Sequence, residues 1–290
     1  RQVETMNRII NSARQEIDGD LVLISLQEVD NMTQRHPGDD QMAILSSGTK
    51  MSYLEFAKFR PFQGGAYGIG IMSRLRIVEY KILNYEKPAD KSSSSSSSSS
   101  SSWRDQSHQR MRHHHHGRHR RPSSMVDERC AKYAPDDFCQ GALAVRIQLP
   151  QSALSIWYVN THLGLAGVQA EEARQLVHRL IVPLQQETNI PIIVSGDFNA
   201  EPESEAIQIM LHEAQLTDTW KVCGDGSSDG HGFTFDSHKP TKRIDYQLLW
   251  VPDHLRGQFR CVRARVPVTE ASDHRPYVVQ YSFTPATAAN

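Results

Sequence analysis

The chain has no long apolar run and almost no net charge. No stretch approaches the ~18 consecutive apolar residues that a membrane-spanning helix needs, so the sequence predicts no transmembrane segment. The net charge is −1 over 290 residues, whereas non-specific nucleic-acid binding normally needs a basic face. The first residue is Arg1 rather than a methionine, so the sequence by itself indicates no compartment.

Cysteines are few and widely spaced. The four, Cys130, Cys139, Cys223 and Cys261, form no C-x-x-C pair and no spacing typical of a metal site. We therefore expect mainly reduced thiols, either packed or on the surface. Cys130 and Cys139 are close enough in sequence to suggest a disulfide that closes a short loop.

Residues 91–122 differ in composition from the rest of the chain. Serines from Ser92 to Ser102 lead into a run rich in histidine and arginine without apolar periodicity, which predicts a disordered surface insertion. Residues 103–122 carry +5, which leaves −6 for the remainder, so the globular body is acidic. The basic arm is a candidate contact for polyanions, and its histidines are either solvated low complexity or ligands for a transition metal.

Outside the insertion, helical and strand-like segments alternate. This order predicts one domain over residues 1–290, built as a two-layered β-sandwich flanked by helices, with mixed strand directions. Helices are expected at 3–17, 41–45, 171–182 and 204–213, and strands at 21–26, 54–59, 68–72, 77–83, 142–149, 154–159, 190–195, 244–251, 259–266 and 276–283.

Polar side chains with metal and phosphate chemistry follow several of these strands. Glu28, His162 and Asp197 each come directly after a buried strand-like run. Asp197 and Asn199 are two residues apart, so in an extended segment both would point the same way. Gly196-Asp-Phe-Asn199 is also typical of an ordinary turn. Carboxylates, an amide and imidazoles together are the groups that cut a phosphate ester with a divalent metal.

Six segments, taken in order, resemble the endonuclease/exonuclease/phosphatase superfamily of metal-dependent phosphoesterases, in particular its compact hydrolase branch. They are Leu26-Gln-Glu-Val-Asp30, Tyr67-Gly-Ile-Gly-Ile-Met-Ser-Arg74, Asn160-Thr-His-Leu-Gly164, Gly196-Asp-Phe-Asn-Ala200, Arg243-Ile-Asp-Tyr246 and Ser272-Asp-His-Arg-Pro276. The resemblance implies the α+β class and a four-layered, DNase I-like α/β/β/α sandwich. Members begin with a strand that ends in an asparagine. This chain begins within the following helix, so we expect that first core strand to be missing from the N-terminus.

The resemblance also implies roles at a metal site. Glu28 would bind Mg²⁺ or Mn²⁺, hard cations that prefer oxygen ligands, and Asp273 would face the same ion directly or through water. Asp197 would position or deprotonate the attacking water, and Asn199 would bind phosphoryl oxygens.

Two imidazoles would serve the phosphate. His162 and His274 can donate hydrogen bonds to its non-bridging oxygens, and as cations would stabilise the charge that accumulates there. In the family Asp245 orients the final histidine, which implies an Asp245–His274 pair.

Three further residues are weaker candidates for substrate binding. Asn160 shares a face with His162 and either orients the phosphate or makes a structural hydrogen bond. Tyr67 and Arg74 flank a strand after Gly64-Gly65 and either contact substrate or hold the loop.

The sequence therefore predicts a monomeric, Mg²⁺-dependent phosphoesterase that hydrolyses a phosphodiester or phosphomonoester by direct attack of a water. Candidate substrates are a nucleic-acid strand and a small or lipid phosphodiester. The alternative is a catalytically inactive superfamily member that acts as a binding or scaffold module, against which the retention of all six segments speaks.

Overall fold

The computed structural model describes residues 22–86, 140–150, 152–165, 167–226, 230–269 and 271–285. The predicted N-terminal helix, the insertion at 91–122, Cys130 and Cys139 lie outside these residues. The strands are β1 (Leu23–Asn31), β2 (Tyr53–Phe62), β3 (Gly65–Ser73), β4 (Ile77–Asn84), β5 (Gly141–Gln148), β6 (Ser155–His162), β7 (Ile192–Asp197), β8 (Thr217–Asp218), β9 (Asp245–Trp250), β10 (Phe259–Arg265) and β11 (Val278–Phe283). The helices are α2 (Gln41–Thr49), α3 (Gln169–Leu176), the π-helical turn η2 (Val177–Ile181), α4 (Val182–Thr188), α5 (Glu205–Glu213), α6 (Thr219–Cys223) and the 3₁₀ turn η3 (Asp253–Leu255).

The strands form three sheets. The largest has six strands in the order β4-β5-β6-β7-β9-β8, and within it β6 and β7 are parallel. A three-stranded sheet has the order β1-β3-β2, and a two-stranded sheet pairs β10 with β11. Among the described residues no strand precedes β1, and β1 and β11 each stand at a sheet edge.

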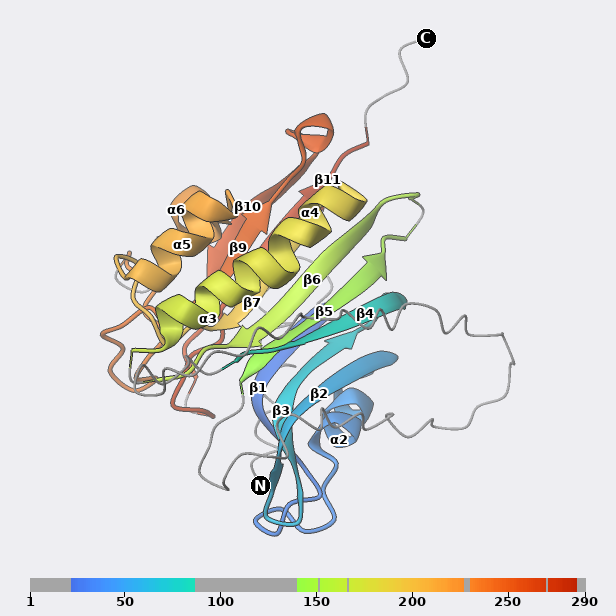
Figure 1. Cartoon of the computed structure of the whole chain (residues 1–290), viewed down its shortest axis with the longest axis vertical. Coiled ribbons are helices and arrows are strands. Elements are labelled where there is room, and N and C mark those ends of the chain that lie inside the picture. The colour runs from blue at the N-terminus through green and yellow to red at the C-terminus, as the bar shows by residue number, and fades with distance from the viewer. Residues whose placement is uncertain are drawn as a thin grey trace, which may run out of the picture.

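The core lies between the six-stranded sheet and the two smaller ones. Ile69 and Ile71 of β3 and Phe259 of β10 are buried against residues of β5, β6 and β7, so both small sheets cover the same face of the large sheet. A second cluster packs α3, α4 and α5 onto the opposite face, and a third packs α2 onto the outer face of the three-stranded sheet. The layers are therefore α/β/β/α, as predicted (Figure 1).

The sequence explains the main elements. β5 and β6 are almost continuously buried, as expected for strands covered on both faces. The helix α2 starts after Asp40, whose carboxylate accepts the amide of Ala43 at 3.1 Å, and ends at Lys50 in a left-handed conformation.

Two differences from the predicted elements have local causes. The helix predicted at 171–182 continues to Thr188, with a π-helical turn before Pro183. Proline has no amide hydrogen and crowds the preceding turn, and a wider turn accommodates it. The short β8 and α6 were not predicted, because two and five residues carry no measurable periodicity.

Cys223 and Cys261 form a disulfide, with Cα atoms 6.2 Å apart, so the expectation of reduced thiols is wrong for this pair. The two residues are 38 apart in sequence, and they meet because α6 packs on β10. No helix in the described part of the chain is long and apolar enough to cross a membrane.

Candidate active site

Strand register places three predicted residues side by side at one end of the central strands of the large sheet. His162 at the end of β6 pairs with Asp197 at the end of the parallel strand β7. Asp197 pairs in turn with Asp245, the first residue of the antiparallel strand β9. Because directly paired residues share a face, the three side chains lie in a row.

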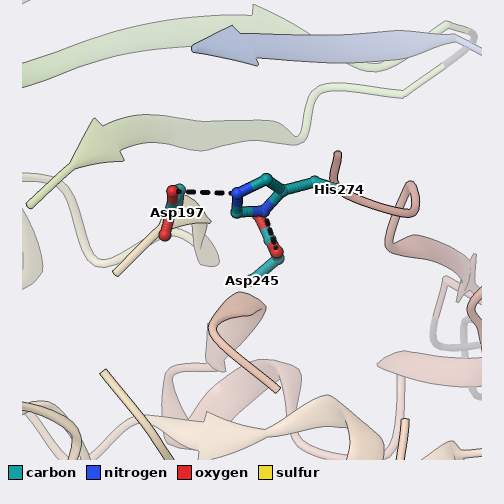
Figure 2. Close-up of side chains that lie close together, drawn as sticks. All are labelled: Asp197, Asp245 and His274. Carbon is teal, nitrogen blue, oxygen red and sulfur yellow. Dashed lines mark hydrogen bonds and ion pairs between the residues drawn. The ribbon is translucent and has the colours of Figure 1, made fainter. Parts of the chain in front are cut away.

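His274 completes this group from a separate segment of the chain. Figure 2 shows its ring between the carboxylates of Asp197 and Asp245. The Nδ1 atom lies 2.8 Å from Asp245 Oδ2, which is the pairing that the family resemblance implied, and Nε2 lies 3.8 Å from Asp197 Oδ2. A bridge to Phe235, whose ring centroid is 5.0 Å from that of His274, holds the segment in place.

The segment Gly196-Asp-Phe-Asn199 is both a turn and part of the site. Asn199 has a φ of 45°, so the expected extended geometry is wrong here, and Asp197 Oδ1 accepts the Asn199 amide at 2.7 Å. The turn nevertheless brings Asn199 Nδ2 to 3.2 Å from His162 Nε2 and to 2.8 Å from the carbonyl of Leu163.

Glu28 reaches the site from the three-stranded sheet. We expected it after a strand, but it lies inside β1, with a φ of 56°, at a break in register between Leu26 and Val29. A β-bulge of this kind re-aims a side chain, and Glu28 is exposed. Its charge acts on Asp197 and His162, and its carboxylate is hydrogen-bonded to the phenol of Tyr67.

Asn160 connects the two sheets beneath Glu28. Its side chain is fully buried, donates to the carbonyls of Leu26 and Gly70 at 2.9 Å each, and accepts from Gln27 at 2.6 Å. These contacts use both amide hydrogens, which a phosphoryl oxygen would need, and this favours the structural reading of Asn160 over contact with the phosphate.

Arg74 lies away from the site, and Asp273 lies on the surface next to His274. Arg74 follows β3, whose last residue Ser73 pairs with Leu23. Since Leu23 is five residues before Glu28 in β1, Arg74 lies about 17 Å along the strand from Glu28, and the structure does not bring it to the group. Asp273 is exposed, accepts from Ser272 Oγ at 3.2 Å, and adds negative charge beside His274.

The sequence profile described as the Endonuclease/Exonuclease/phosphatase family matches residues 4–274. The chain belongs to this family. The search of curated proteins found no match.

Solved structures of the family share the fold at low identity. The mannosyl-6-phosphatase of Bacteroides thetaiotaomicron VPI-5482 is 16% identical with a TM-score of 0.63, over 97% of this chain and 92% of that one. The human Nocturnin catalytic domain with bound sulfate is 18% identical with a TM-score of 0.59, over 96% and 86%. A conserved protein of unknown function from Enterococcus faecalis V583 is 16% identical with a TM-score of 0.62, over 98% and 91%.

Burial and neighbouring charges shift the pKa values of three titratable groups at the site of this family member. Burial, followed by the charge of Asp245, raises the pKa of Asp197 to about 7. Burial acts to lower the pKa of His274, but the hydrogen bond and charge of Asp245, with further charge from Asp197, raise it to about 9. Burial lowers the pKa of His162, which favours its neutral form over the cation that we expected there.

The concentration of negative charge at the site suits a divalent cation. Ligating atoms of Asp197, Asp245 and His274 lie within 4.8 Å of one another, and Glu28 adds a further carboxylate charge that acts on Asp197. Crowded carboxylates raise one another's pKa, and a bound cation relieves that repulsion. Carboxylate oxygens are the ligands that Mg²⁺ prefers.

Two residues of α3 support the site and were missed from the sequence. Glu172 accepts the Gly164 amide at 2.6 Å, just after His162, and Gln169 donates to the Asn199 carbonyl at 3.1 Å. Both hold loops that carry site residues. The amphipathic helix is visible in the sequence, but the loops that its polar face contacts are not.

Proposed function

We propose that this protein is a divalent-metal-dependent phosphoesterase that hydrolyses a phosphodiester or phosphomonoester by direct attack of a water. The observation that supports this most strongly is the row of His162, Asp197 and Asp245 in strand register, closed by His274. Residues that are far apart in sequence meet there in one group whose members can each accept or donate a proton.

The metal would be held by Glu28, with Asp273 facing it, as the resemblance implies. When bound, Mg²⁺ or Mn²⁺ would neutralise charge on the phosphate and lower the barrier to attack. His274 is assigned to the phosphate rather than to the metal, because a ring that donates Nδ1–H to Asp245 and carries a proton on Nε2 has no lone pair left for a cation.

The remaining residues have roles in proton transfer and charge stabilisation. Asp197 is the general base for the attacking water, since its carboxylate lies 3.5 Å from His162 and 3.8 Å from His274, at the centre of the row. Asp245 holds the ring of His274 so that Nε2–H can donate to a phosphoryl oxygen. Asn199 and His162 form the other side of the phosphate site.

The comparisons support phosphate-ester substrates without choosing among them. One structural neighbour is a mannosyl-6-phosphatase, and another holds sulfate, a tetrahedral anion. For this chain the candidate substrates remain a nucleic-acid strand and a small or lipid phosphate ester. The protein would act on them as a monomer.

The test is release of p-nitrophenol from bis-p-nitrophenyl phosphate and p-nitrophenyl phosphate with Mg²⁺, Mn²⁺ or EDTA. We expect Glu28→Ala and His274→Ala to lower kcat at least about a hundredfold. The matched controls Glu187→Ala and His254→Ala, both on the exposed surface, should keep wild-type turnover. Turnover that resists EDTA, or full activity in both site variants, would reject the proposal. Absence of turnover on either ester with either metal would instead favour a binding or scaffold module.

A further inference from the structure

A pocket of about 350 Å³ adjoins Glu28 and is separate from the row around Asp197. Its lining residues are Glu28, Asp30, Arg35, His36 and Gln41. The volume is at the lower end of the range for small-molecule sites, with room for one ring. Because Glu28 lines the pocket and its charge also acts on Asp197, a substrate phosphate at the metal would place its attached group in or beside this pocket.

Asp30 organises the pocket from within. It is 1% exposed and accepts two hydrogen bonds from Arg35, Nε to Oδ2 at 2.5 Å and Nη2 to Oδ1 at 3.0 Å. His36 Nε2 lies 3.5 Å from the same carboxylate, and Gln41 Oε1 accepts the Asp30 amide at 2.8 Å. Asp30 is thus a positioning residue that fixes Arg35 and His36.

Two aromatic rings also contact the Arg35 guanidinium. The Arg35 guanidinium carbon lies 4.8 Å from the ring centroid of Phe62 and 5.8 Å from that of Tyr67. Its bonds to Asp30 use Nε and Nη2, and no described residue accepts from Nη1, so the Nη1 hydrogens can bond a ligand. The Arg35 side chain is 43% exposed and that of His36 is 26% exposed, so both are within reach of a bound molecule.

The balance of charge decides which chemistry the pocket suits. Among the described residues that line the pocket, Asp30 and Glu28 together outweigh the positive charge of Arg35, so these residues offer no surplus positive charge to a second anionic group. An apolar group would cover the polar atoms of Arg35 and His36 without giving them partners, which is costly. Hydroxyl groups both donate and accept, and they pair with a guanidinium, an imidazole and an amide without adding charge.

We propose that this pocket binds a neutral, hydroxyl-rich ring, such as a sugar or cyclitol, that is esterified to the phosphate. The inference rests on the proposed function for the position of that phosphate. Arg35 and His36 contact the hydroxyl groups, and Asp30 acts through them. The substrate class is therefore a phosphate ester of a polyol.

Two probes of equal charge test this inference. Glucose 6-phosphate and n-hexyl phosphate compete with bis-p-nitrophenyl phosphate, and each Ki is measured. We expect the wild type to favour glucose 6-phosphate by about a hundredfold or more, because polar sites reject analogues that lack hydroxyls. Fructose 1,6-bisphosphate should compete no better than glucose 6-phosphate, and a much lower Ki for it would overturn the argument from charge.

Variants assign the preference to the pocket. Arg35→Met should reduce the ratio of the two Ki values by about tenfold or more. Because that change leaves Asp30 buried without its cation, Arg35→Lys is the second variant: it keeps the charge but loses the fork of donors, and should also reduce the ratio. Arg256→Met, at a side chain 74% exposed, is the control and should leave the ratio unchanged.

The outcomes separate this inference from the proposed function. Equal Ki values for the two probes in the wild type, or equal weakening of both in Arg35→Met and Arg35→Lys, would overturn it. If the protein has no turnover, saturation-transfer NMR with the same two probes in EDTA replaces inhibition. A preference for glucose 6-phosphate there would uphold the pocket while the enzymatic proposal fails, and no preference would overturn both.

Discussion

The buried ion pair between Arg243 and Asp218 gives the sharpest prediction of stability. Both side chains are 3% exposed, and the guanidinium donates twice to the carboxylate, Nη1 to Oδ1 at 3.0 Å and Nη2 to Oδ2 at 2.7 Å. Asp218 also caps α6, accepting the amide of Trp220 at 3.0 Å. The pair therefore ties β8 and α6 to Arg243, which lies two residues before Asp245, the first residue of β9.

Removing one partner leaves the other charge buried and unpaired. Arg243→Met and Asp218→Asn should each lower the free energy of unfolding by about 3–5 kcal/mol. The double variant removes both charges, while the amide oxygen of the new asparagine still caps α6. It should therefore cost less than the sum of the single variants by at least about 2 kcal/mol.

Urea unfolding of the four proteins measures this cycle. The control is the pair between Arg256 and Asp253, which has a similar separation of 2.8 Å but is 74% and 86% exposed. Arg256→Met should change stability by well under about 1 kcal/mol. Single-variant costs below about 1 kcal/mol at Arg243 and Asp218, or costs that simply add, would refute the argument from burial.

Three further predictions follow from other features. Reducing the disulfide opens a loop spanning 38 positions, so dithiothreitol should lower the free energy of unfolding by about 4 kcal/mol; identical urea midpoints with and without it would contradict this. Burial raises the pKa of Glu172 from 4.5 to about 7, so the folded state binds this proton more tightly and stability is lost as pH rises from about 4.5 through 7. Glu172→Gln should remove that loss, up to about 3 kcal/mol, and parallel pH profiles for variant and wild type would count against it. Asp245→Asn should lower kcat at least about a hundredfold with little change in Tm, because it frees the ring of His274; a collapse of Tm instead would point to a structural role.

Much of the fold could be predicted from sequence because its strands are long and apolar. Residues 142–149 and 154–159 read as buried strands and form β5 and β6, since strands covered on both faces have a nearly continuous hydrophobic pattern. The order of six polar segments was sufficient to predict the family and the layered architecture. The same order identified the carboxylates and imidazoles that are candidates for the site.

Local conformation and long-range contact were decided by the tertiary structure. The bulge at Glu28 depends on pairing between β1 and β3, and no pattern within β1 alone specifies a break in register. The disulfide between Cys223 and Cys261 depends on the packing of α6 against β10, and the sequence offered no spacing signal for it.

The pKa shifts of the two histidines could not be predicted from the sequence either. His162 and His274 have the same side chain, yet burial lowers the pKa of His162 while Asp245 outweighs burial and raises that of His274. The sequence alone determines which residue types occupy the site. Their charges, and the polar pocket that Asp30 builds beside them, depend on neighbours that only folding supplies, because desolvation and Coulomb interactions are set by distances in space.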